Sequence, residues 1–192
     1  MNKEMLRKRC KEKISHIPPE TFKKLGEDIF SSVSQTEEWK KSKTVFIFVS
    51  LKNEADTTPF LLGALQGGKR LCVPRITGKG TMVAVEIKSL SELKSGKFGI
   101  FEPIDGCRTV EKGEIDLAIL PCLAADVEGH RLGRGGGFYD RFCENLSCAK
   151  IAICPEMLLT ENGEIPIEGH DVSVDKIATE KRIIEPSTRI DF

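Results

Sequence analysis

The chain has 192 residues, of which 40% are hydrophobic and 30% charged, and its 29 Lys and Arg balance its 29 Asp and Glu. This composition predicts one globular domain over residues 1–192, large enough to bury a core without disulfide bonds or metals. Sequence-independent nucleic-acid binding needs a surplus of cations, so the net charge of zero argues against a nucleic-acid partner.

The seven cysteines are odd in number and contain no C-x-x-C pair, and the chain has three histidines. This usage is typical of reduced thiols in a cytosolic protein rather than of a disulfide framework or a zinc site. The first residues are charged where a signal peptide needs an apolar core, and the apolar run near residues 45–51 is too short to span a bilayer. We therefore predict a cytoplasmic protein without a membrane partner.

Apolar residues at helical spacing predict helices, and short apolar runs rich in β-branched residues predict buried strands. Trp39 falls in a short polar stretch, and residues 89–112, rich in Gly, Ser and charge, are expected to form loops. In chain order, we expect helices over residues 3–14 and 19–33, a strand over 44–49, a helix over 58–65, strands over 70–74, 82–87 (an edge strand) and 115–121, a helix over 138–146, and strands over 150–154 and 176–178.

Strands that alternate with helices predict an α/β fold with a mostly parallel sheet and helices on both faces. Ligands of such sheets bind at the carboxyl ends of the strands. The loops after Val49, Pro74 and Pro121 begin at such ends, so we expect the functional site there.

The segment from Asp126 to Arg141 is rich in glycine and arginine and precedes a predicted helix. Glycines let the backbone approach a ligand closely, a helix start offers free N–H groups, and guanidinium groups suit phosphate oxygens. The segment therefore predicts a nucleotide-phosphate site, the alternative being a flexible solvated loop. It matches neither the P-loop nor the dinucleotide fingerprint, because Phe138 stands where the third glycine would be. The residues concerned are Gly133, Gly135, Gly136, Gly137, Arg131, Arg134 and Arg141.

Two aspartates are candidates for Mg²⁺ beside these phosphates. Asp140 lies in the first turn of the predicted helix, where it could instead interact with the helix dipole. Asp171 comes from a distant stretch, where it could equally be an ordinary loop residue that forms a turn.

The run GHRLGRGGGFYDR, residues 129–141, resembles the phosphate loop of the 5-formyltetrahydrofolate cyclo-ligase family. Other segments keep the family's order along nearly the whole chain: residues 3–7, 53–57, 74–75, 98–103, 116–121 and 171–175. The resemblance implies a three-layer α/β/α sandwich and ATP- and Mg²⁺-dependent conversion of 5-formyltetrahydrofolate to 5,10-methenyltetrahydrofolate. In the family, ATP phosphorylates the formyl oxygen, N10 closes the ring, and ADP and phosphate are released.

The resemblance also implies site residues, with Arg134 and Tyr139 as catalytic residues and Asp140 and Asp171 as magnesium ligands. The ATP-binding residues it implies are Lys3, Glu4, Met5, Leu6, Arg7, Arg131, Leu132, Gly133, Arg134, Gly135, Gly136, Gly137, Phe138 and Tyr139. The folate-binding residues it implies are Arg7, Val49, Glu54, Arg134, Gly135, Gly136, Gly137 and Phe138.

Three positions depart from the family's usual pattern. Phe138 replaces a tyrosine, and Cys154 and Met157 lie where an aromatic residue and a nearby glutamine are common. The alternatives to the cyclo-ligase are a nucleotide-binding module without catalysis and a phosphosugar isomerase on a related scaffold.

Overall fold

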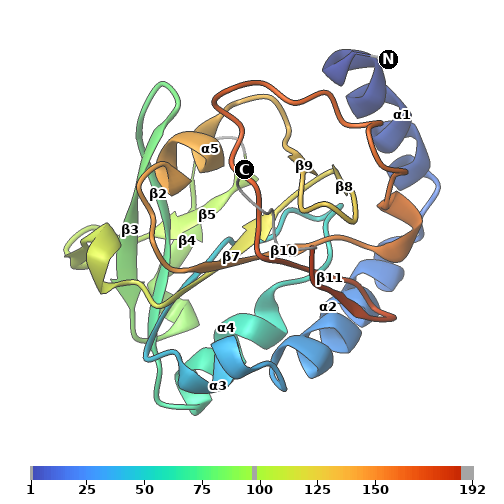
Figure 1. The fold of residues 1–192 in the computed structure, drawn as a ribbon. Helices are drawn as coiled ribbons and strands as arrows, with labels where there is room; N and C mark the ends of the chain where they lie inside the picture. The colour runs from blue at the N-terminus through green and yellow to red at the C-terminus, as the bar shows by residue number, and fades with distance from the viewer. Residues whose placement is uncertain (1, 97–98, 187–192) are drawn as a thin grey trace.

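The computed structural model describes residues 2–96 and 99–186, so Phe98 of the family-like segment 98–103 lies outside the described residues (Figure 1). Its centre is an eight-stranded sheet with the order β12-β11-β10-β7-β1-β2-β3-β6. The strands of this sheet are β1 (Thr44–Ile47), β2 (Arg70–Gly78), β3 (Thr81–Ile87), β6 (Thr109–Val110), β7 (Leu117–Pro121), β10 (Ala149–Ile153), β11 (Lys176–Ala178) and β12 (Ile183–Ile184).

The middle of the sheet is parallel, as predicted. Strands β2, β1, β7, β10 and β11 pair in parallel, whereas β3, β6 and β12 join antiparallel. Strand β1 is fully buried, which explains why its sequence is a continuous apolar run. The prediction that residues 82–87 form an edge strand was wrong, because β6 pairs with the outer side of β3.

Helices cover both faces of the sheet, in agreement with the predicted sandwich (Figure 1). Helices α2 (Pro19–Val33) and α4 (Thr58–Gln66) cover one face, where Phe60 lies edge-on to Phe30 at 5.0 Å between ring centroids. On the other face α5 (Phe138–Cys143) stacks Phe142 on Phe46 of β1 at 4.5 Å. Helix α1 (Lys3–Ser15) lies beside the small β8–β9 ribbon, formed by Ala124–Ala125 and Arg131–Leu132.

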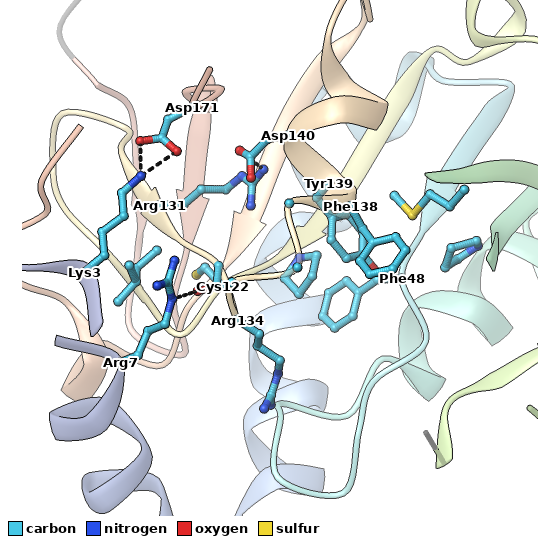
Figure 2. Close-up of a pocket in the computed structure, with 18 of the residues that line it drawn as sticks. Lys3, Arg7, Phe48, Cys122, Arg131, Arg134, Phe138, Tyr139, Asp140 and Asp171 are labelled. Atoms are coloured by element: carbon cyan, nitrogen blue, oxygen red, sulfur yellow. Dashed lines mark hydrogen bonds and ion pairs between the residues drawn. The ribbon is translucent and has the colours of Figure 1, made fainter. Parts of the chain in front are cut away.

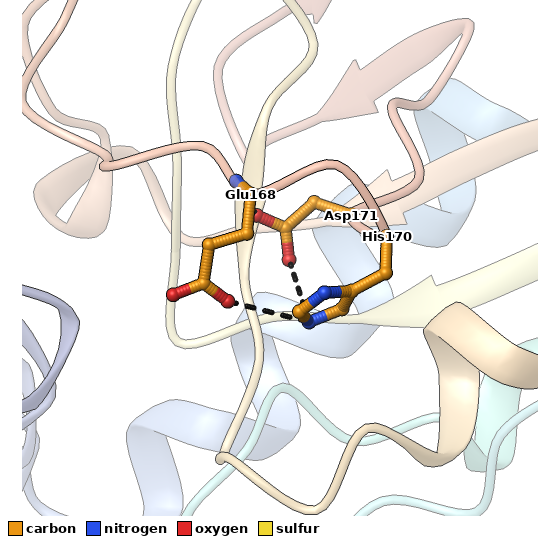
Figure 3. Close-up of side chains that lie close together, drawn as sticks. All are labelled: Glu168, His170 and Asp171. Carbon is orange, nitrogen blue, oxygen red and sulfur yellow. Dashed lines mark hydrogen bonds and ion pairs between the residues drawn. The ribbon is translucent and has the colours of Figure 1, made fainter.

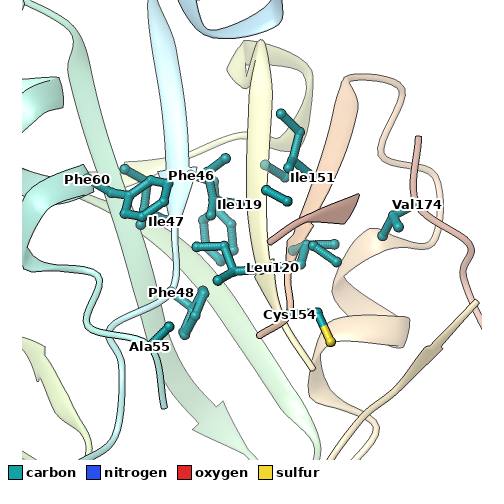
Figure 4. Close-up of a cluster of buried hydrophobic side chains, with 14 of the residues drawn as sticks. Phe46, Ile47, Phe48, Ala55, Phe60, Ile119, Leu120, Ile151, Cys154 and Val174 are labelled. Atoms are coloured by element: carbon teal, nitrogen blue, oxygen red, sulfur yellow. The ribbon is translucent and has the colours of Figure 1, made fainter. Parts of the chain in front are cut away.

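The hydrophobic core is one cluster that runs through the sheet and both helix layers (Figure 4). Residues from β1, β7 and β10, among them Phe46, Ile119 and Ile151, are fully buried in it. Among the described residues, no helix combines the length and the apolar character that a bilayer-spanning segment requires.

Several element boundaries differ from the predictions for local physical reasons. Residues 89–112 are not all loop, because β4 (Leu93–Ser95) pairs with β5 (Phe101–Pro103). Trp39 lies buried in a short helix, α3 (Glu37–Lys41), whose start the Thr36 hydroxyl caps. Helix α5 ends at Cys143 instead of residue 146, because Asn145 adopts a left-handed φ of 62°. Short 3₁₀ helices lie at Leu90–Glu92, Lys112–Glu114 and Glu156–Leu158.

Gly26 on α2 touches the backbone that leads into α4, and this contact supplies a test of the packing. A Cβ at residue 26 would lie 2.0 Å from the carbonyl oxygen of Asp56. Because backbone cannot yield as a flexible side chain does, we expect Gly26→Ala to destabilise the protein by about 1–3 kcal/mol or more. Thermal unfolding followed by circular dichroism measures the effect. Gly113→Ala is the control, since no atom lies within 4 Å of its Cβ position; equal Tm values for the two variants would contradict the packing described.

Candidate active site

A cavity of about 750 Å³ lies at the carboxyl ends of three neighbouring parallel strands. Phe48 and Val49 enter it after β1, and Pro121 and Cys122 enter it at the end of β7. Pro74 lines it from β2. Strand β1 lies between β2 and β7, which follow it in the sequence on opposite sides, so the cavity occupies a topological switch point. The prediction that a loop begins after Pro74 was wrong, because β2 continues to Gly78 and pairs there with β3; that the functional site lies at this edge of the sheet stays a prediction.

The glycine-rich segment forms one wall of this cavity (Figure 2). Gly135 and Gly137 have φ values of +100° and +65°, which side chains other than glycine rarely adopt. A Cβ on Gly136 would lie 2.8 Å from the Phe138 ring, so glycine is also required there for space. Helix α5 has six residues, fewer than predicted, so its dipole contributes less to anion binding than the sequence suggested.

Arg131 lies in the cavity wall with its side chain only 2% exposed and paired with Asp140. Its Nη2 donates to Asp140 Oδ1 at 2.8 Å, and the backbone N–H of Val172 donates to the same oxygen at 3.3 Å. The Nε of Arg131 is buried and has no hydrogen-bond partner within the described chain. A buried guanidinium N–H without an acceptor costs the free energy of its desolvation.

Lys3 reaches the same end of the cavity from α1 and pairs with two carboxylates. Its Nζ lies 2.6 Å from Asp171 Oδ2 and 3.0 Å from Glu168 Oε2. Burial opposes the charge of Lys3, but the hydrogen bonds to Asp171 and Glu168 raise its pKa. Burial likewise opposes the charge of Asp171, and the hydrogen bond from Lys3 keeps the pKa of Asp171 lowered.

Glu168, His170 and Asp171 form a cluster whose potential ligand atoms lie within 4.8 Å of one another (Figure 3). His170 Nε2 lies 3.3 Å from Glu168 Oε2. All three residues line the cavity on the side where Lys3 enters. The cluster therefore offers oxygen atoms to a cation next to the predicted phosphate position.

Arg134 and Glu54 line the cavity and contact each other directly. Arg134 Nε donates to Glu54 Oε1 at 2.7 Å, and its Nη2 donates to Asn53 Oδ1 at 3.2 Å. The second oxygen of Glu54 accepts from the Leu51 backbone N–H at 2.9 Å. Both side chains thus have hydrogen-bond partners within the protein.

The cavity has a charged half and an apolar half. Figure 2 shows Lys3, Arg7, Arg131, Asp140 and Asp171 on one side, and Phe48, Phe138 and Tyr139 on the other. Further apolar lining on the second side comes from Pro74, Ile76 and Met82. Burial, with the nearby charge of Glu54, raises the pKa of Tyr139, so its hydroxyl stays protonated and can only donate or accept hydrogen bonds.

Comparison with known proteins shows the family of this chain. The family model of the 5-formyltetrahydrofolate cyclo-ligase family matches residues 1–180. The chain belongs to this family.

Individual family members match along nearly the whole chain. The 5-formyltetrahydrofolate cyclo-ligase of Escherichia coli K12 is 27% identical over 175 residues, which cover 88% of this chain and 95% of the relative. The mitochondrial relative from Arabidopsis thaliana is 28% identical over 97% of this chain and 77% of its own. The solved structure of the Aquifex aeolicus 5,10-methenyltetrahydrofolate synthetase superposes with a TM-score of 0.86 at 31% identity, covering 100% and 96% of the two chains. The predicted fold and enzyme family are confirmed.

The structure brings most of the predicted site residues of this family member into one cavity. From the N-terminal segment, Lys3, Glu4 and Arg7 line it, whereas Leu6 is fully buried in the core and Met5 is 59% exposed outside it. Of the site residues that the family resemblance implies, all except residues 5–6 line the cavity: Lys3, Glu4, Arg7, Val49, Glu54, the unbroken run 131–139, Asp140 and Asp171. The binding roles themselves stay predictions.

Two arginines, Arg7 and Arg141, donate to backbone carbonyl groups. Arg141, one of the three arginines of the glycine-rich segment, is not part of the cavity lining: its Nε donates to Gly80 O at 2.7 Å and its Nη2 donates to Gly136 O. Arg7 Nε donates to Gly133 O at 2.9 Å, which fastens α1 to the loop. Both contacts stabilise the shape of the glycine-rich wall.

Several residues that line the cavity were not predicted as site residues from the sequence. Phe48, Met82 and Glu102 line the cavity but resemble ordinary strand residues in the sequence. Glu102 Oε1 accepts from the Ile76 backbone N–H at 2.9 Å, which attaches β5 to β2. Glu168 was detectable only through its spacing from Asp171, and loop carboxylates at that spacing are common without a ligand.

Proposed function

We propose that the protein converts 5-formyltetrahydrofolate to 5,10-methenyltetrahydrofolate with ATP and Mg²⁺ and releases ADP and phosphate. The observation that carries this proposal is the division of one cavity into a cationic half beside the glycine-rich wall and an aromatic half beside β1 and β2. Two chemically unlike substrates must meet in such a reaction, and the cavity offers each of them a fitting surface.

The cationic half suits a triphosphate. Backbone N–H groups of the segment Gly133–Gly137, the guanidinium group of Arg131 and the ammonium of Lys3 can all donate to phosphate oxygens. Phosphoryl transfer depends chiefly on positioning and charge neutralisation, so no side-chain nucleophile is required. Arg134 can reach the transferring group if its guanidinium leaves Glu54.

The donor atoms present fit Mg²⁺, because hard cations prefer carboxylate oxygens. Asp140 and Asp171 both line the cavity, and the Val172 backbone N–H that donates to Asp140 directly follows Asp171 in the chain. These two aspartates, with Glu168 beside them, would hold the ion. Bound there, Mg²⁺ would neutralise phosphate charge; the cations that now pair with these carboxylates, Arg131 and Lys3, would turn to the phosphates.

The aromatic half suits a reduced pterin. Phe48 and Phe138 offer ring faces, and Glu54 offers carboxylate oxygens to the amino and amide N–H groups of the pterin. In the proposed reaction the formyl oxygen attacks the γ-phosphorus and ADP leaves. N10 then attacks the formyl carbon, loses its proton, and the C–O bond to phosphate breaks. The protonated Tyr139 hydroxyl can donate to the phosphorylated oxygen as that bond breaks.

The proposal is tested by adding Mg-ATP and 5-formyltetrahydrofolate to the purified protein and following the absorbance of the methenyl product. We expect product and ADP in equal amounts, and no product without ATP or after chelation of Mg²⁺. Nucleotide binding without absorbance change would favour the non-catalytic binding module. Sugar-phosphate turnover without ATP would favour the isomerase.

We also propose a cytoplasmic location, which the seven free thiols favour.

A further inference from the structure

Two cysteines that the proposed reaction does not use follow neighbouring strands of the sheet, and one of them lines the cavity. Cys122 follows β7, is half-buried and lines the cavity, whereas Cys154 follows β10 and is fully buried. Figure 4 shows Cys154 in the core, at the end of its strand. One thiol of the two can therefore be reached through the cavity, and the other cannot.

The sheet register brings these two residues together. Strands β7 and β10 are parallel neighbours, and their last matched pair is Pro121 with Ile153. Cys122 and Cys154 are therefore the residues that directly follow the matched ends of these two neighbouring strands. Neighbouring strands lie about 4.8 Å apart, within the range of Cα separations that a disulfide bond spans, about 4.4–6.8 Å.

The contacts of the sulfur atoms agree with the register. Cys122 Sγ lies 3.2 Å from the carbonyl oxygen of Ile153, the residue directly before Cys154. A side-chain hydrogen bond with Cys122, together with burial, raises the pKa of Cys154. The Cys154 thiol is therefore protected from reagents in solution, whereas the neighbouring Cys122 thiol is accessible to reagents that enter the cavity.

We propose that Cys122 and Cys154 form an oxidisable dithiol site that reacts with small-molecule disulfides entering the cavity. The Cys122 thiolate attacks one sulfur of the small disulfide, forms a mixed disulfide and releases one thiolate. Cys154, after loss of its proton, attacks Cys122 Sγ and expels the second thiolate. Two electrons pass from the protein to the small disulfide, and an excess of a dithiol reductant reverses both steps.

The position of the site connects it to the glycine-rich wall. Leu123, directly after Cys122, donates its backbone N–H to Leu132 O at 2.7 Å, and β8 pairs with β9, which contains Arg131. A covalent group on Cys122 thus lies in the cavity and next to the strand that holds this arginine.

The test uses the full-length protein and 2-hydroxyethyl disulfide, a small neutral probe. The protein is incubated with the probe, free thiols are blocked with N-ethylmaleimide, and the digest is mapped by mass spectrometry. We expect the peptide pair joined through Cys122 and Cys154 to exceed any other cysteine pair roughly tenfold, because the two thiols are held together. Cys154→Ser should stop at one probe adduct on Cys122, and Cys122→Ser should leave Cys154 unmodified. Cys107→Ser is the matched control, since Cys107 is equally half-buried, and it should retain the cross-link.

Other outcomes would overturn the proposal. These are a dominant link between Cys122 and the buried Cys10 of α1, modification of Cys154 in Cys122→Ser at the wild-type rate, or an unmodified Cys122 when Cys107 has reacted. The wild-type map decides the main question even if a variant fails to fold. Because the readout is a peptide mass, it is independent of whether the protein turns over folate.

Discussion

Replacing Arg134 by alanine is expected to lower kcat about 10²–10³-fold with Mg-ATP and 5-formyltetrahydrofolate, the effect of removing one preorganised donor to developing charge. Arg134 lies on the glycine-rich wall and contacts Glu54 and Asn53. Steady-state kinetics with each substrate varied in turn measures the loss.

Arg134→Lys separates charge from geometry. Lysine keeps the positive charge but loses the planar fork, so we expect it to recover only part of the activity. Arg108→Ala is the control, because Arg108 makes an exposed ion pair with Glu114 at 3.1 Å, and such pairs contribute little. If Arg134→Ala kept near wild-type kcat while binding both substrates normally, Arg134 would not be a catalytic residue.

Glu54→Gln is expected to raise the KM for folate about 10–100-fold, the loss associated with hydrogen bonds to a charged group. The same change should leave nucleotide affinity unchanged or make it stronger. Glu54 holds Arg134 at 2.7 Å with only 12% of the Glu54 side chain exposed, and the neutral amide releases this guanidinium for phosphate. Isothermal titration of the protein with Mg-ATP, without folate, measures the second effect.

Together the two variants test whether this ion pair couples the two substrates. If folate takes over Glu54 and frees Arg134, each substrate should tighten binding of the other by the same factor, because coupling free energies are reciprocal. The coupling should disappear in Glu54→Gln. Glu20→Gln, an exposed change of the same kind on α2, should preserve it. Weaker nucleotide binding by Glu54→Gln would show that Glu54 supports the nucleotide instead of restraining Arg134.

The parts of the fold that sequence patterns predicted well are those where one local pattern suffices. The buried runs at β1 and β7 could hardly be anything but central strands, and the apolar face of α2 matched its buried residues. The patterns failed for α3 and β6. The four charged residues around the buried Trp39 show no helical period, and the two residues of β6 are too few for any period to be visible.

For the candidate site too, some features could be predicted from the sequence and others could not. The sequence by itself determined that residues 131–140 form a glycine-rich, cationic wall, because consecutive residues of restricted type carry that information. Only the tertiary structure decided which distant side chains meet this wall: Lys3 with Asp171, Arg134 with Glu54, and Phe48 in the aromatic half. It also removed Leu6 and Arg141 from the cavity lining. The physical reason is that side-chain direction and strand register depend on packing between elements far apart in the chain, which local propensity does not encode.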